Sequence, residues 1–259
     1  MKNYLILLLF WCWSAQGQTD MKVTTSHGAV IRGDSSQKNI ALVFTGHEFA
    51  EGGEDILNTL ESSGTKASFF FTGDFYRNKD FQDLVRSLKV AGNYLGAHSD
   101  RHLLYCDWSN RDSLLVDKNT FIEDVKANYK EMAKFGIEKE QAKYYLPPYE
   151  WYNDSISHWT GEMELQLVNF TPGTRSNADY TTAGMPNYVD SETIFQSIVG
   201  YEEKVTNGLN GFILLLHLGA GPLRPDKFHD RLPELIQILK GKGYTFVTID
   251  QLLGNRIKY

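Results

Sequence analysis

The chain contains three short apolar runs in its first half, Ile40-Ala41-Leu42-Val43-Phe44, Ala67-Ser68-Phe69-Phe70-Phe71 and Tyr94-Leu95-Gly96-Ala97. Each has the length and composition of a buried strand. Between them, apolar residues recur at helical spacing, first within residues 51–63 and then within residues 81–88. Strands that alternate with helices predict an α/β fold with a mostly parallel sheet and helical crossovers.

The same alternation continues toward the C-terminus. A helix is expected from Thr120 to Lys134, and further strands at residues 165–170, 211–216 and 244–249. Another helix is expected at residues 232–239, between the last two strands. The chain has no Gly/Pro-rich linker and no internal repeat. We therefore predict one domain.

Composition and charge narrow the class of protein. The 259 residues are 42% hydrophobic, which is enough for one sizeable core. The formal net charge is -6, whereas a protein that tracks nucleic-acid phosphates needs a basic stripe. We expect no nucleic-acid partner, and the oligomeric state stays open.

The N-terminus is typical of a secretory signal peptide over residues 1–17. Lys2 supplies positive charge, residues 5–13 are apolar, and Ser14-Ala15-Gln16-Gly17 provides small residues before the cleavage point. The apolar run is shorter than the roughly 20 residues that span a bilayer, so no stable membrane anchor is expected. Cleavage would leave Cys106 as the only cysteine, which suits export to the periplasm, cell surface or exterior of a bacterium.

Polar segments follow several of the expected strands. They are Thr45-Gly46-His47-Glu48, His98 to His102, Pro147 to Trp151, Thr171 to Asp179, and His217. In a parallel barrel the carboxyl ends of the strands meet on one face, so these segments are expected to rim one pocket. The first turn has no glycine-rich phosphate loop, which disfavours a nucleotide cofactor.

Two histidines four residues apart, His98 and His102, are the first candidates for metal binding. Neutral imidazole is the commonest metal-binding side chain, and a pair at this spacing can supply two ligands to a zinc-like ion. A hydrogen-bonded structural pair is the alternative.

The order and spacing of these segments resemble the polysaccharide deacetylases, the family-four carbohydrate esterases with a NodB-type domain. His98-Ser99-Asp100-Arg101-His102 is similar to the family's H-S/T-x-x-H metal motif, and Pro147-Pro148-Tyr149 to the end of its R-P-P-Y-G motif. Leu215-Leu216-His217 is similar to the L-x-H motif, and residues 243–249 to the strand that closes the domain.

The resemblance implies a fold, an activity and a set of roles. The fold would be a distorted (β/α) barrel of mostly parallel strands over residues 38–255, after an N-terminal lead of residues 18–37. The activity would be metal-dependent hydrolysis of N- or O-acetyl groups on a polysaccharide or oligosaccharide, with zinc as the first candidate metal. His98 and His102 would be metal ligands, His217 would protonate the leaving group, and the Tyr149 amide would stabilise the oxyanion.

The family's T-F-D-D-G motif is altered in this chain. In the aligned run, Thr45 replaces the aspartate that acts as base and Gly46 replaces the aspartate that binds metal. Glu48 and His47 lie just downstream and are candidates for the third ligand, Glu48 also for the base. Asp100 and Glu150 are further carboxylates that could reach the same rim. The alternatives are a solvated helix face for Glu48 and a loop or capping role for His47.

Substrate contacts are expected from Trp151, Arg175, Asp179 and Tyr180, because sugar rings stack on aromatic side chains and polar loops can bind hydroxyl groups. Ordinary packing and an ordinary surface loop are the alternatives. The leading hypothesis is an exported deacetylase that acts on an acetylated glycan. A barrel that binds carbohydrate without catalysis, or a hydrolase of another non-peptide C–N or ester bond, are the others.

Overall fold

The computed structural model describes residues 22–254. The expected signal peptide, residues 1–17, lies outside the described residues. Within the described range, no helix combines the length and the apolar character needed to cross a membrane.

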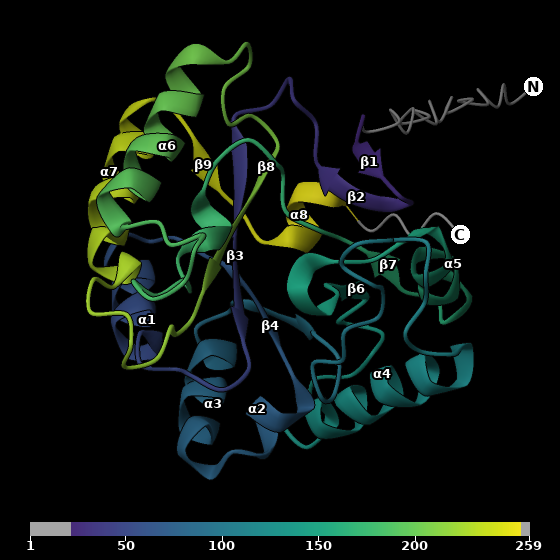
Figure 1. The fold of residues 1–259 in the computed structure, drawn as a ribbon. Helices are drawn as coiled ribbons and strands as arrows, with labels where there is room; N and C mark the ends of the chain where they lie inside the picture. Colours follow the sequence, from purple (N-terminus) through teal and green to yellow (C-terminus); the bar gives the residue numbers. More distant parts are fainter. Residues whose placement is uncertain (1–21, 255–259) are drawn as a thin grey trace, which may run out of the picture.

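The sheet is a curled barrel of mostly parallel strands (Figure 1). The strands are β1 (Thr24–Ser26), β2 (Ala29–Arg32), β3 (Asn39–Gly46), β4 (Ser68–Phe71), β5 (Tyr94–Ala97), β6 (Tyr144–Tyr145), β7 (Gln166–Leu167), β8 (Phe212–His217) and β9 (Thr245–Phe246). Their order is β1-β2-β8-β3-β4-β5-β6-β7, with β9 paired to β3. Only the β1–β2 and β2–β8 pairs are antiparallel. An isolated parallel bridge between Val30 of β2 and Val168, the residue after β7, connects the two sides of the curled sheet.

Helices lie around the outside of the sheet, and α8 lies near its middle (Figure 1). They are α1 (Gly53–Ser62), α2 (Gly73–Arg77), α3 (Gln82–Val90), α4 (Lys118–Ala133), α5 (Asp154–Glu162), α6 (Ser191–Lys204), α7 (Leu232–Gly241) and α8 (Ile249–Leu253), with short 3-10 turns η1 (Lys79–Phe81), η2 (Pro148–Glu150), η3 (Ser176–Ala178) and η4 (Phe228–Arg231). The larger apolar core lies between the strands and the outer helices. A smaller core fills the barrel, where Ile249, Leu252 and Leu253 of α8 pack against strand residues such as Val43 and Leu215.

The α/β class and the distorted barrel are confirmed, and most expected elements in the first half lie where the periodicity placed them. The second half differs more. The strand expected at residues 244–249 ends at Phe246, because Thr248 begins a capping box that starts α8 at Ile249. Residues 24–32, expected as a lead into the domain, form β1 and β2, and β2 pairs with β8.

Candidate active site

A cavity of about 600 Å³ opens at the carboxyl ends of β3, β5 and β8. Parallel pairing sets Thr45 of β3 beside His217 of β8, and the polar segments after the strands therefore meet on this face. The lining residues are Thr45, Gly46, His47, Glu48, Phe49, His98, His102, Trp108, Tyr149, Glu150, Tyr180, Thr182, Met185, His217, Gly219, Ala220, Gly221, Pro222 and Leu223.

His98 is a buried, neutral imidazole with a fixed tautomer. Its Nδ1 lies 2.8 Å from the carbonyl oxygen of Leu146. Because a carbonyl only accepts, Nδ1 carries the proton and Nε2 keeps a free lone pair. Burial lowers the pKa of His98 to about 3, so the ring stays neutral at physiological pH. A histidine fixed in this way is typical of metal ligands.

His102 lies at the centre of a group of rings. Its ring centroid is 5.0 Å from that of His98, 4.3 Å from that of Tyr149 and 4.8 Å from that of His47. Burial, with a smaller contribution from His98, lowers the pKa of His102 to about 2. The His47 ring stacks on His102, and its Nδ1 lies 3.1 Å from Oγ1 of Thr72. The three imidazoles are therefore close neighbours.

Side chains of helix α4 accept hydrogen bonds from the backbone of residues 98–102, the loop that carries His98 and His102. Asn128 accepts a hydrogen bond from the His98 amide at 2.9 Å, and the buried carboxylate of Asp124 accepts from the amides of Asp100 and Arg101, both at 3.2 Å. The Asp100 side chain instead forms an ion pair with Arg77 at 2.7 Å and does not line the cavity.

His217 and Asp179 form a hydrogen-bonded pair at the site. Asp179 Oδ1 lies 2.6 Å from His217 Nδ1, and Oδ2 accepts the His217 amide at 2.8 Å. The Asp179 side chain is only 5% exposed, whereas the His217 side chain is 18% exposed and lines the cavity. Burial opposes protonation of His217, but the charge and hydrogen bond of Asp179 outweigh it and raise the pKa of this histidine. The pair is arranged as a general acid with its orienting carboxylate.

The other predicted site residues fall into two groups. Tyr149 and Tyr180 line the cavity, and the Tyr180 ring centroid is 4.8 Å from that of His217. Glu48 also lines it and is exposed. Three residues predicted to bind substrate lie outside the lining: Trp151, Arg175 and Asp179, the last of which is buried against His217. Trp151 donates its Nε1 hydrogen to the carbonyl of Asp107, and Arg175 is exposed at the start of η3.

The side chains at this site include donors of the type that a divalent metal prefers, but they do not form a complete set of ligands. His98 and His102 are neutral imidazoles, which suit zinc and similar ions. No group of three His, Cys, Asp or Glu side chains arranged to hold a metal occurs within residues 22–254. The set lacks a carboxylate ligand at the end of β3. There the Thr45 hydroxyl is buried with no hydrogen-bond partner among the described residues, and Gly46 has no side chain.

Replacing Gly46 with aspartate is expected to destabilise the protein by about 1–3 kcal/mol without adding a metal ligand. A Cβ at this position would lie 2.8 Å from Phe71 Cδ1 and 3.0 Å from Phe75 Cε2, so the space is already filled by aromatic rings. Urea unfolding and metal analysis measure the two effects. Gly161→Ala is the matched control, because a Cβ there meets nothing within 4 Å. An unchanged unfolding midpoint for G46D would contradict the prediction.

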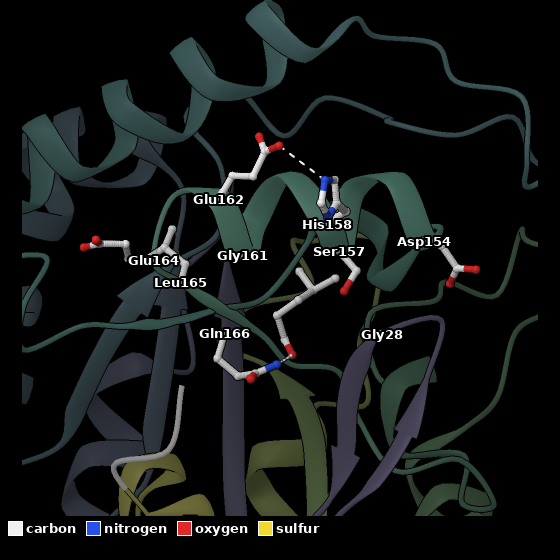
Figure 2. A pocket seen from close by; sticks show the side chains of 10 residues that line it. Gly28, Asp154, Ser157, His158, Gly161, Glu162, Glu164, Leu165 and Gln166 are labelled. Carbon is white, nitrogen blue, oxygen red and sulfur yellow. Dashed lines mark hydrogen bonds and ion pairs between the residues drawn. The ribbon is translucent and has the colours of Figure 1, made fainter. Parts of the chain in front are cut away.

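A second hollow of about 610 Å³ lies beside α5 (Figure 2). It is open, and none of the predicted site residues lines it. Its histidine, His158, is exposed and pairs with Glu162 of the same helix at 3.3 Å. Within residues 22–254, the predicted histidines and Tyr149, Tyr180 and Glu48 therefore gather at the first cavity and not at the second hollow.

The residues at the cavity differ in how well the sequence alone predicted them. The histidines stand directly after strands and were predictable. Thr182, Met185 and Leu223 also line it, but they come from loops without a motif. Asp124 and Asn128 had a signal, because they are polar residues on the same face of α4 as Phe121 and Val125.

Residues 32–168 match the family model described as polysaccharide deacetylase. A curated relative, a chitin deacetylase of Pestalotiopsis sp, is 25% identical over 229 residues, which cover 88% of this chain and 68% of the relative. Solved structures that share the fold include the following two. A peptidoglycan N-acetylglucosamine deacetylase has a TM-score of 0.70 at 20% identity, covering 88% of this chain and 94% of that one. A CE4 family pseudoenzyme from Bacillus anthracis has a TM-score of 0.67 at 17% identity, covering 90% and 72%.

Proposed function

Because this chain belongs to the polysaccharide deacetylase family, whose members are hydrolases of acetylated carbohydrate, we propose that it is an exported enzyme that removes N- or O-acetyl groups from a polysaccharide or oligosaccharide. One observation carries the proposal: His217, oriented by Asp179 at 2.6 Å, lines the same cavity as the neutral imidazoles of His98 and His102. We further propose that residues 1–17 direct export.

The roles follow from the geometry. His217 would donate a proton to the leaving nitrogen or oxygen, because Asp179 fixes its Nδ1 proton and leaves Nε2 for the substrate. The Tyr149 amide is the proposed donor to the developing oxyanion. Rim aromatics that are exposed, Trp108 at 56% and Tyr180 at 40%, would stack on sugar rings.

A divalent metal, with zinc as the first candidate, would be held by His98 and His102, with His47 or Glu48 as third ligand. When bound, such a metal lowers the pKa of a water molecule and polarises a carbonyl group. The protein would supply the neutral imidazoles, and the Leu146 carbonyl would keep the His98 ring in the tautomer that metal binding requires.

Acetate release tests the function directly. The purified mature chain, with zinc supplied, is incubated with an N-acetylated chitooligosaccharide and with an O-acetylated xylan. We expect catalytic release of acetate from at least one of them, and about one metal ion per chain. Release of acetate from neither substrate would contradict a deacetylase function.

The second candidate function is carbohydrate binding without catalysis. It is favoured by Thr45 and Gly46, which leave the end of β3 without a carboxylate, and by the rings of Phe71 and Phe75 that occupy the space beside Gly46. Calorimetric binding of either glycan without any release of acetate would support this second function.

A further inference from the structure

We propose that Glu150 is a catalytic residue, the carboxylate that takes a proton from the attacking water in place of the aspartate missing at Thr45. This inference rests on the deacetylase function proposed above. Glu150 lines the cavity together with His217, Tyr149 and Tyr180. It stands where the family motif quoted above ends in glycine.

The backbone is held in an unusual conformation at this position. Tyr149 and Glu150 have φ values of 57° and 53°, the left-handed region that non-glycine residues rarely adopt. Two hydrogen bonds fix the turn: the Glu150 amide donates to the Pro147 carbonyl at 3.1 Å, and Asn169 Nδ2 donates to the Glu150 carbonyl at 2.9 Å. Backbone strain of this kind persists where the surrounding structure enforces it, and it clusters at functional sites.

The carboxylate of Glu150 is available to a water molecule. No side chain or amide of residues 22–254 donates a hydrogen bond to it, and it forms no ion pair within that range. Its side chain is partly buried. A carboxylate in the cavity without a protein donor can accept a proton from water, provided that it is ionised when the water attacks.

The other acidic side chains near the cavity are committed elsewhere or exposed. Asp179 is bound to His217, and Asp100 forms its ion pair outside the cavity. Glu51 accepts hydrogen bonds from two loop amides and pairs with Lys227 at 2.6 Å. Glu48 lies at the rim and is exposed. Glu150 is thus the partly buried carboxylate that faces the cavity without a partner.

Charged neighbours tune the affinity of Glu150 for protons. Burial raises the pKa of this carboxyl to about 7, His217 opposes the rise, and Asp179 adds to it. Tyr180 also faces Glu150, and its own pKa is raised by burial and by the Glu150 charge. A base with a pKa near the working pH combines an ionised fraction with useful basicity.

In the proposed hydrolysis, Glu150 accepts one proton and His217 donates one. Water loses one proton to Glu150 as its oxygen bonds to the acetyl carbon. His217 then protonates the leaving nitrogen or oxygen as its bond to that carbon breaks, which gives acetic acid and the free amine or hydroxyl. Glu150 then releases its proton to solvent and His217 regains one from solvent, which restores the starting state.

The test compares Glu150→Gln and Glu150→Gly with wild type on the two acetylated substrates. We expect both variants to lose about 10²- to 10⁴-fold in kcat/KM. Metal content should be unchanged. Removing the carboxylate should also abolish the rise of activity with pH near pH 7, because a base must be deprotonated to act. The glycine variant relieves the left-handed strain, so its Tm should not fall.

A readout independent of activity comes from stability. Folding raises the pKa of Glu150 from 4.5 to about 7, so ionisation of this carboxylate destabilises the fold progressively as pH rises from about 4.5 and in full above about 7. E150Q should therefore have a higher Tm than wild type at pH 8, by a larger margin than at pH 5. Glu164 is the matched control, because it is exposed, has a φ of 60° and points away from α5 beside the second hollow (Figure 2). E164Q should match wild type in activity and in the pH dependence of Tm.

The outcomes separate the two proposals. An active wild type with E150Q within threefold of it overturns the role of Glu150 and leaves the deacetylase function standing. Loss of metal in both Glu150 variants also overturns the role as base, because the carboxylate would then be a ligand. A wild type that releases no acetate while it binds glycan overturns the proposed function and the role of Glu150 with it.

Discussion

Replacing Asp179 with asparagine is expected to lower kcat for acetate release by about 10²- to 10⁴-fold, with a smaller change in KM. The carboxylate accepts the Nδ1 proton of His217 at 2.6 Å and its amide proton at 2.8 Å. Asparagine has the same shape but no charge, so it can no longer stabilise the imidazolium. It can also present its NH₂ group to Nδ1, which would favour the wrong tautomer.

The same variant should shift the pH profile in a definite direction. Asp179 raises the pKa of His217 against the effect of burial. Since a general acid must be protonated, activity falls as pH rises through this pKa. Without the Asp179 charge the pKa drops, and the alkaline limb of the kcat profile moves to lower pH. Asp154→Asn is the control, because this side chain is 82% exposed on α5. An Asp179→Asn enzyme with the wild-type rate and profile would exclude Asp179 as the carboxylate that orients and charges His217.

Strand order and register explain why much of the site was predictable. Parallel pairing aligns Thr45 with His217 and Phe71 with Ala97, so residues that follow these strands in sequence must meet in space. His98 and His217 needed no further information. A short apolar run followed by a histidine was sufficient to place them on one face.

Side-chain direction in the loops was not predictable in the same way. Trp151 follows the proline turn, but its indole nitrogen bonds to the Asp107 carbonyl and Arg111 packs over its ring at 3.7 Å. Glu150 enters the cavity only because it and Tyr149 adopt left-handed backbone angles, which local sequence rules assign to glycine or asparagine. A hydrogen bond from Asn169, 19 residues away in sequence, supports that conformation, and no periodicity reveals it.

Replacing His98 with alanine is expected to have the second large effect. Metal content should fall from about one ion per chain to less than about a tenth, and kcat/KM by about 10³-fold or more. The structure supplies the reason. His98 is buried, its Nδ1 proton is held by the Leu146 carbonyl, and its pKa of about 3 keeps Nε2 unprotonated. Plasma emission spectroscopy of the purified chain measures the metal, and acetate release measures the rate.

Two further variants keep this result interpretable. Alanine leaves a cavity beneath the histidine loop and removes the donor to Leu146, so His98→Gln is included because its amide can still donate to that carbonyl. His158→Ala removes an exposed imidazole from α5 and should leave both metal content and activity unchanged. If H98Q folds with the wild-type Tm but lacks metal, the imidazole lone pair holds the ion. If H98A and H98Q both retain a full equivalent of metal, the pair His98 and His102 is structural, and the metal must be sought elsewhere.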